Sequence, residues 1–236
     1  MKSPPPLTVF IIPDNNRTYA RKRGISIAEG YMTGYERIKE IVDGAWDFGV
    51  THLVIWALGK QNLRRPRQEL EDLFQLLGRG IRELRASEAF RTRDIRFRAV
   101  GEWHRVLPRD LAREISRLEE DTKSRSSLVL TLAIAYNGRD DMAHAMAAIL
   151  EKEKPSVSND RIRELIPLYL QSSFVPDIDL MIRTGGEEPH LSEGAFMWQM
   201  SAAHTEFPQK CWPEFTKKDL SLIISKFRKR ERRFGK

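Results

Sequence analysis

The stretch that decides the fold is Leu7–Asp14, LTVFIIPD, an apolar run that stops at a proline and an acidic residue. A short apolar run bounded by a turn signal predicts a buried strand that feeds a loop. A second such run lies at His52–Leu58, and between the two runs Ile38, Ile41 and Val42 recur at helical spacing. Strand, helix and strand in this order are typical of a parallel βαβ unit.

The same alternation continues to the end of the chain. Further strands are predicted at Asp94–Val100, Ser127–Ala135, Ile178–Ile182 and Ala195–Met200, and further helices from Pro66 (with the apolar stripe Leu70, Leu73, Phe74, Leu77, Ile81, Leu84), at Leu107–Thr122, at Asp140–Glu153 and around Leu220, Ile223, Ile224 and Phe227. The pattern predicts an α/β fold: a single domain over residues 1–236, with a mostly parallel central sheet flanked by helices.

Composition narrows the class of protein. Of the 236 residues, 41% are hydrophobic and 31% charged, which is typical of a globular chain. The single cysteine, Cys211, permits no intrachain disulfide and fits a reducing, cytoplasmic location. The net charge of +7 favours anionic ligands such as phosphorylated small molecules. No zinc-finger or RNA-recognition spacing accompanies the charge, so nucleic acid is not an expected partner.

Two of the predicted strand ends are followed by residues that could bind a metal ion or a phosphate. Pro13–Arg17 (PDNNR) offers an acidic residue, two amides and a cation, and Arg183–Glu187 (RTGGE) offers an arginine beside paired glycines. Ligands of parallel sheets bind at the carboxyl ends of strands, so both segments are candidates for a metal and phosphate site. Each has a simpler interpretation when taken alone: a helix cap at Asp14 or Asn15, and a glycine turn with a surface arginine at Arg183.

Five segments in this order and spacing resemble one family. They are IIPDNNRTYA (11–20), AYNGRDD (135–141), RTGGE (183–187), WPEF (212–215) and RERRFG (230–235). The chain resembles the cis-prenyltransferases, the undecaprenyl and dehydrodolichyl diphosphate synthase family, over nearly its whole length. The resemblance implies that family's fold and a Mg²⁺-dependent prenyltransferase, which condenses isopentenyl diphosphate with an allylic diphosphate to give a Z-isoprenoid diphosphate. It further implies a dimer, either of this chain or with a homologue, and loose association with a membrane surface.

The resemblance also assigns roles to single residues. Asp14 matches the aspartate that handles Mg²⁺ and diphosphate, and Asn16 matches an asparagine implicated in proton removal. His204 falls where the family has a glutamate that binds Mg²⁺, with Glu206 two residues on as the alternative. The positions expected to bind substrate are Tyr31, Asn62, Arg65, Arg183, Gly185, Gly186 and Ser192, together with Arg17, which lies close in sequence to the positions where family cations are lost.

The departures from the family pattern cluster where the allylic diphosphate binds. Two arginines are replaced by Thr18 and Ile27, a histidine by Tyr31, and a serine by Gly59. Three interpretations follow: a chain-elongating enzyme, an irregular terpene synthase that joins units head-to-middle or cyclises them, and a non-catalytic subunit of a heteromeric enzyme. Offshoots of the second kind carry a tyrosine where Tyr31 lies, and retention of Asp14 argues against the third.

Overall fold

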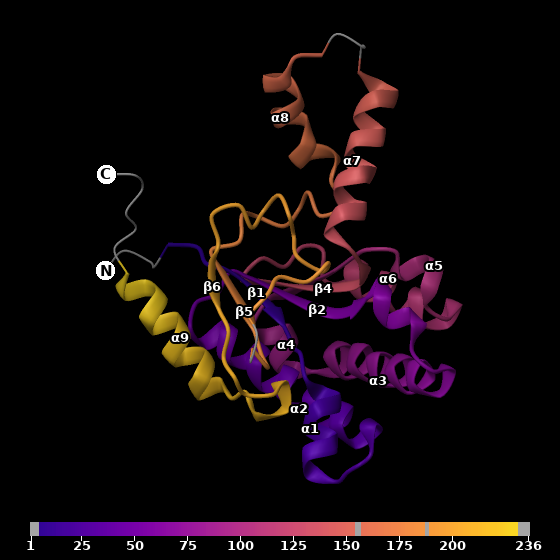
Figure 1. Ribbon diagram of the computed structural model, residues 1–236, viewed down its shortest axis with the longest axis vertical. Helices are drawn as coiled ribbons and strands as arrows, with labels where there is room; N and C mark the ends of the chain where they lie inside the picture. The colour runs from indigo at the N-terminus through magenta and orange to yellow at the C-terminus, as the bar shows by residue number, and fades with distance from the viewer. Residues whose placement is uncertain (1–4, 154–156, 187–188, 231–236) are drawn as a thin grey trace.

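The structure is a computed structural model that describes residues 5–153, 157–186 and 189–230. Its centre is one sheet of six strands, all parallel, in the order β3-β4-β2-β1-β5-β6 (Figure 1). The strands are β1 (Thr8–Ile12), β2 (His52–Gly59), β3 (Ile95–Val100), β4 (Leu128–Tyr136), β5 (Leu180–Arg183) and β6 (His204–Glu206). The predicted α/β class is confirmed, whereas the domain bounds 1–236 stay a prediction because both chain ends lie outside the described residues.

The apolar run that opened the sequence forms the middle of the sheet. All five residues of β1 are buried, because β2 and β5 pair with its edges and both of its faces are covered. On one face Val9 and Ile11 join the larger core, and on the other Phe10 and Ile12 join a second one. A strand buried on both faces needs a continuous apolar run, which is what the sequence supplies.

Helices cover the sheet and connect its strands. They are α1 (Asn16–Arg23), α2 (Ile27–Asp47), α3 (Arg67–Ala86), α4 (Glu88–Thr92), α5 (Trp103–Val106), α6 (Arg109–Asp121), α7 (Gly138–Lys152), α8 (Asn159–Tyr169) and α9 (Lys217–Lys229), with single 3-10 turns at Lys60–Arg64 and Trp212–Glu214. Helix α2 begins at a capping box made by Ser26 and Glu29. Helices α7 and α8 pack on each other and project away from the sheet (Figure 1). The described helices include none long and apolar enough to cross a bilayer.

Helix α3 does not bury its apolar stripe completely. The stripe predicted from the sequence is present, yet Leu73, Leu77 and Leu84 are only half-buried, and Ile81 alone among the stripe residues is fully buried. An amphipathic helix normally buries such a face against the core. The half-buried leucines therefore indicate a space between α3 and the rest of the molecule.

One predicted strand is wrong. Residues 195–200 form turns, and the sixth strand is instead the short β6, which pairs with β5. The apolar side chains of 195–200 reach the core without a strand: the ring of Phe196 lies edge-on to Phe10 at 5.0 Å and stacks on Tyr136 at 4.4 Å. Burial alone cannot distinguish a strand from a packed turn, and three residues are too few to show an alternating pattern.

Candidate active site

The two segments singled out at the strand ends meet in the structure. Strands β1 and β5 are neighbours, with Ile12 in register with Arg183. The Arg183 guanidinium donates to Asp14 Oδ2 from Nη2 at 2.7 Å and from Nε at 3.2 Å. The Asp14 backbone N–H donates to Thr184 Oγ1 at 3.0 Å, which joins the two segments beside the ion pair. A carboxylate and a cation 169 residues apart thus form one site.

This ion pair presents its carboxylate rather than its cation. The Asp14 side chain is 41% exposed, whereas that of Arg183 is 11% exposed. Arg183 Nη1 also donates to the backbone oxygen of His190 at 2.9 Å, which fixes the guanidinium from the other side. Because a guanidinium has five N–H groups, these three bonds leave it capacity for an anionic ligand.

A left-handed turn at Asn15 lets the segment after β1 lie close to Gly185. Asn15 has φ 65°, a region that asparagine tolerates better than most residues, and its Nδ2 donates to the Gly185 oxygen at 3.1 Å. Gly185 has φ 78°, and a Cβ there would lie 2.2 Å from Asn15 Nδ2. At Gly186 a Cβ would lie 2.9 Å from Phe207 Cβ. Both glycines are therefore required by the loop.

An apolar cavity of about 620 Å³ leads away from Asp14 between α2, α3 and the sheet. Its polar end is formed by Asp14, Asn15, Asn16, Arg17, Thr18, Arg21, Tyr31, Asn62 and Arg65. Its apolar wall includes Ile38, Val42, Leu73, Leu76, Leu77, Ile81, Leu84, Phe90, Ile95, Leu130 and Leu132. The half-buried leucines of α3, Leu73, Leu77 and Leu84, line this cavity.

A second charged cluster lies at the polar end of the cavity, around the buried carboxylate of Glu69. The Tyr31 hydroxyl donates to Glu69 Oε1 at 2.7 Å and accepts from Arg65 Nη1 at 2.7 Å. Arg65 Nε and Arg17 Nε lie 3.4 and 3.8 Å from the same Glu69 oxygen. Burial, together with the bond to Glu69, raises the pKa of Tyr31, so the phenol stays neutral.

Sequence reasoning missed Glu69, although a signal was present. Glu69 follows Arg65 by four residues, the spacing of a helical ion pair. It also lies four residues before Leu73, on the edge of the apolar stripe of α3. A carboxylate on the apolar face of a helix needs a buried partner, and Tyr31 and Arg65 supply it.

Asn16 and Asn62 line the polar end together with Asn15. Asn16 Nδ2 donates to the Pro13 oxygen at 2.9 Å, and Asn62 Oδ1 accepts from the Gly59 N–H at 2.9 Å. Position 59 requires glycine for a steric reason, since a Cβ there would lie 2.3 Å from the Trp56 ring. Ile27, in contrast, is exposed at the start of α2 and is not among the cavity-lining residues.

Ser192 lies at the same edge of the sheet but outside the cavity lining. Its Oγ accepts from the Gly194 N–H at 3.2 Å. The loop that carries it crosses the ends of β2 and β4: a Cβ on Gly194 would lie 2.2 Å from the Trp56 ring, and the Gly138 N–H donates to the Glu193 oxygen at 2.8 Å. The loop therefore joins Arg183 to the wall of the cavity.

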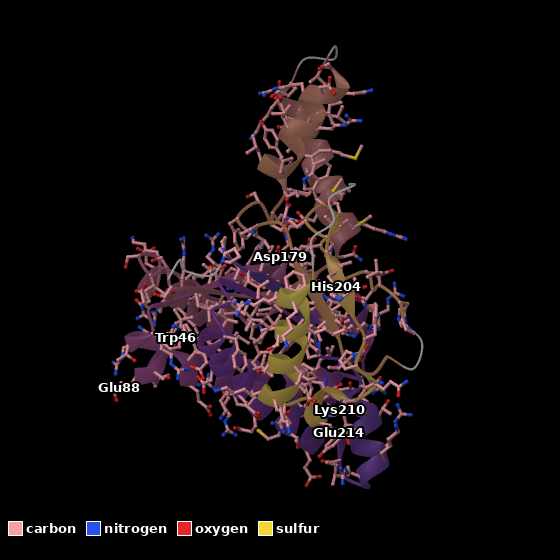
Figure 2. All side chains as sticks on the ribbon, turned by 90° about the vertical axis from the view of Figure 1, so that its left-hand side faces the viewer. Trp46, Glu88, Asp179, His204, Lys210 and Glu214 are labelled. Atoms are coloured by element: carbon pink, nitrogen blue, oxygen red, sulfur yellow. The ribbon has the colours of Figure 1, made fainter. Side chains whose placement is uncertain are left out.

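His204 lies toward the opposite end of the strands, where β5 and β6 begin. It begins β6 in register with Leu180, three residues before Arg183, which is about 10 Å along a strand. The ring is paired with Glu206 Oε1 at 2.8 Å and with Arg230. Figure 2 shows His204 near one end of α9 and Lys210 near the other, and it is the Lys210 oxygen that accepts from the Gly185 N–H at 2.7 Å.

Asp14 and His204 of one chain consequently do not lie side by side. The metal role of His204, or of Glu206 as its alternative, stays a prediction. The last two arginines of RERRFG, Arg232 and Arg233, lie outside the described residues.

The residues present suit Mg²⁺ only together with a phosphate ligand. Among the described residues no cluster of three or more His, Cys, Asp or Glu side chains could hold a metal ion. Asp14 is a single, half-exposed carboxylate at the polar end of the cavity. Mg²⁺ is commonly bound by one or two carboxylates plus the phosphates of a substrate, which is the arrangement that this donor set fits.

Known proteins of the same kind share both the sequence and the fold. Over 233 residues the chain is 36% identical to a Methanopyrus kandleri tritrans,polycis-undecaprenyl-diphosphate synthase (geranylgeranyl-diphosphate specific), which covers 98% of this chain and 85% of the relative. It is 32% identical over 231 residues to the isoprenyl transferase of Aquifex aeolicus, covering 98% of this chain and 96% of the relative.

Two solved structures match over the whole sheet and its helices. Lavandulyl diphosphate synthase from Lavandula x intermedia, in complex with dimethylallyl diphosphate, superposes with a TM-score of 0.85 at 30% identity over 98% of both chains. A probable undecaprenyl diphosphate synthase from Campylobacter jejuni gives 0.76 at 28% identity over 100% of both chains. The family model described as putative undecaprenyl diphosphate synthase matches residues 12–235, so the chain belongs to the cis-prenyltransferase family of prenyl-transferring enzymes.

Proposed function

We propose that this chain condenses isopentenyl diphosphate with an allylic diphosphate, releasing pyrophosphate and a Z-isoprenoid diphosphate. The observation that carries the proposal is the Asp14–Arg183 pair, set at the polar end of an apolar cavity. Both substrates have the same two parts, a polyanionic head and an apolar tail. The charged end of the cavity suits the heads, and the leucine-rich wall of α3 suits the tails.

The reaction needs charge control at the diphosphates more than a strong base. The allylic C–O bond breaks and its electron pair leaves with pyrophosphate, while the isopentenyl double bond attacks the allylic carbon and a proton leaves the isopentenyl unit. Mg²⁺, held by Asp14 and the diphosphate, would neutralise the departing charge. Arg183, with Gly185, Gly186 and Ser192, is proposed to hold the isopentenyl diphosphate.

Asn16 is proposed to position the proton that is lost. Its Nδ2 gives one of its two N–H groups to the Pro13 oxygen, which leaves the second N–H and Oδ1 for a ligand. A neutral amide is a weak base, so the proposed acceptor of the proton is a diphosphate oxygen. Asn16 orients this proton transfer and does not itself accept the proton.

The growing tail is proposed to occupy the cavity between α2 and α3. Each methylene moved from water to an apolar wall contributes about 0.8 kcal/mol. Leu73, Leu77 and Leu84 currently lack full packing, so a prenyl chain would complete the apolar face of α3. Binding energy of this kind favours elongation, because each added unit contributes further contacts.

Irregular coupling of two allylic units is the second candidate. The specific observations that favour it are the superposition on lavandulyl diphosphate synthase, with a TM-score of 0.85, and the tyrosine at position 31. The same cavity and the same charged end would serve, with the attacking double bond belonging to a second allylic molecule. The two candidates differ in the carbon skeleton of their products.

Turnover followed by product identification separates the candidates. The protein is incubated with radiolabelled isopentenyl diphosphate and dimethylallyl, geranyl, farnesyl or geranylgeranyl diphosphate, with and without Mg²⁺. Mass spectrometry of the dephosphorylated products is expected to show linear Z-prenols that require Mg²⁺. A branched or cyclic alcohol would instead support irregular coupling. No product with any primer would defeat both candidates, and activity only after addition of a homologue would identify a subunit of a heteromeric enzyme.

We further propose that the chain assembles as a dimer, with itself or with a homologue. The supporting observation is that Leu150 on α7 and Leu168 on α8 are 80% and 69% exposed on the projecting helix pair. Light scattering after size exclusion is expected to give twice the mass of the 27.4 kDa chain, alone or mixed with a homologue. A monomer in both cases contradicts the proposal.

A further inference from the structure

The Glu69 cluster has the opposite burial pattern to the Asp14–Arg183 pair. The Glu69 side chain is 9% exposed, whereas Arg65 and Arg17 are 23% and 46% exposed. The buried member is the carboxylate, and the cations are the members that remain accessible. Both arginines line the polar end of the cavity, as does Asp14.

We infer that Glu69, acting with Tyr31, positions Arg17 and Arg65 as the two cations that hold the allylic diphosphate in this chain. The inference rests on the proposed function. It assigns to the allylic diphosphate two of the positions already expected to bind substrate, in a chain where two family arginines are replaced by Thr18 and Ile27, and it adds Glu69. Arg17 and Arg65 are the binding groups. Glu69 is a positioning residue, because it acts through the arginines.

The hydrogen bonds fix one side of Arg65 and leave the other side open. Nη1 is bound to the Tyr31 hydroxyl and Nε faces Glu69, while Nη2 makes no hydrogen bond with any of the described residues. A guanidinium held at Nε and one Nη nitrogen still presents N–H groups that can bond a phosphate. Arg65 also lies over the Tyr31 ring, with its Cζ 5.8 Å from the ring centroid, which further restricts its rotamer.

The charges leave the cluster suited to an anion. Two guanidinium groups are opposed by one carboxylate, and Tyr31 is neutral, so the cluster carries a net positive charge. Without Glu69 the two arginines would repel each other at the mouth of a partly apolar cavity. The Glu69 carboxylate therefore offsets the repulsion between the two cations. The Tyr31 hydroxyl links Glu69 to Arg65, because it donates to the carboxylate and accepts from Arg65.

Binding of an unreactive allylic ligand tests the inference. Dimethylallyl thiodiphosphate, with sulfur in place of the bridging oxygen, is titrated calorimetrically into the full-length protein with Mg²⁺. Glu69→Gln and Arg17→Ala are each expected to weaken binding about tenfold or more, since each affects a charge-assisted contact. In an Arg65→Ala background the effect of Glu69→Gln is expected to shrink, because the residue through which it acts is gone.

Matched controls come from the same helix. Arg67 and Glu71 form an exposed pair at 2.8 Å that does not line the cavity, and Arg67→Ala and Glu71→Gln are expected to leave the affinity unchanged. Urea unfolding of each variant shows what fraction is folded. Should Glu69→Gln fail to fold, Tyr31→Phe keeps the ring, removes the bridging hydroxyl and is expected to weaken binding severalfold.

Two outcomes overturn the inference: folded Glu69→Gln binding like the wild type, or a loss that is equally large in the Arg65→Ala background. Steady-state kinetics gives a second readout, in which Glu69→Gln raises KM for the allylic substrate and leaves KM for isopentenyl diphosphate unchanged. Failure of the proposed function is distinguishable, because absence of turnover in the wild type leaves the binding titration intact.

Discussion

The two charged clusters at the mouth of the cavity are built in opposite ways. In one, the Arg183 side chain is 11% exposed and that of Asp14 41%; in the other, Glu69 is 9% exposed, Arg65 23% and Arg17 46%. In each cluster the buried member is fixed by additional hydrogen bonds or by its surroundings, and the exposed member is available to a ligand. The first cluster therefore offers a carboxylate, which suits a cation, and the second offers guanidinium groups, which suit an anion. The more exposed member of each pair therefore decides which charge the cluster mainly presents, while Arg183 still keeps N–H groups for the isopentenyl diphosphate.

The largest expected effect is at Asp14. Asp14→Asn removes the exposed carboxylate while keeping its shape, and kcat for isopentenyl incorporation is expected to fall about 1,000-fold, in the range seen when an electrostatic group is removed from an active site. The buried Arg183 loses its partner, so the free energy of unfolding is expected to fall by about 1–3 kcal/mol. Asp110→Asn, in an exposed pair on α6, serves as the control. Near-normal turnover in folded Asp14→Asn would contradict the role given to the carboxylate.

A somewhat smaller effect is expected at Arg183. Arg183→Ala is expected to lower kcat/KM for isopentenyl diphosphate about 100-fold, because a charge-assisted contact and the support of Asp14 are lost together. Arg183→Lys should recover little, since an ammonium cannot reproduce the forked contact to Asp14. Initial rates at varied isopentenyl diphosphate measure both variants, with the exposed Arg113→Ala as the comparison. An unchanged KM for isopentenyl diphosphate in Arg183→Ala would remove this residue from the site.

The apolar wall should respond independently of both clusters. Leu77→Trp places a larger ring in the cavity and is expected to shorten the product by at least one isoprene unit, at a stability cost of about 1–3 kcal/mol. Affinity for the thiodiphosphate is expected to stay within about twofold of the wild type, because the charged end is unchanged. Leu222→Trp, at a 60% exposed position on α9, is the control. Products of wild-type length from Leu77→Trp would show that the tail does not occupy this cavity.

The smallest effect is expected at a third pair, farther along the contact between α2 and α3. The Tyr35 hydroxyl donates to Glu83 Oε2 at 2.6 Å, and this bond, followed by Arg79, lowers the pKa of Glu83 to about 2. A lowered carboxyl pKa stabilises the fold above the unfolded value of 4.5, and that stability is lost as the pH falls toward 2. Tyr35→Phe is therefore expected to reduce the unfolding free energy at pH 7 by about 0.5–1 kcal/mol, a small figure because Glu83 is 37% exposed.

Urea unfolding at pH 7 and at pH 2 measures the Tyr35→Phe effect. The difference from the wild type is expected at pH 7 and should shrink as the pH falls to 2, where Glu83 begins to be protonated in the wild type as well. A difference that is equally large at both values would contradict the account, because the loss would not depend on the charge of Glu83.

The sequence predicted the parts of the fold and site that depend on local pattern. The continuous apolar run at Leu7–Ile12 predicted a buried strand, and the motifs at 14 and 183 follow strands whose carboxyl ends share an edge. It could not predict the β6 strand, because three residues carry no periodicity, or the packed turn at 195–200, because apolar residues there reach the core through Phe196 without a ladder.

The Glu69 cluster escaped prediction for a different reason. Its members come from α1, α2, the start of α3 and the turn before it, so only the packing of α2 on α3 brings Tyr31 to Glu69. The placement of His204 depends likewise on strand register, which spacing along the chain does not give. Motifs identify which groups are present, whereas burial decides which of them a ligand can reach.

The most direct test of the two-cluster account is the Mg²⁺ dependence of thiodiphosphate binding in Asp14→Asn and Glu69→Gln, measured by calorimetry. The account predicts that Mg²⁺ strengthens binding about tenfold or more in the wild type and in Glu69→Gln, although the latter binds more weakly throughout, and that it has little effect in Asp14→Asn. Equal strengthening by Mg²⁺ in Asp14→Asn and in Glu69→Gln would show that the two clusters do not divide cation and anion binding between them.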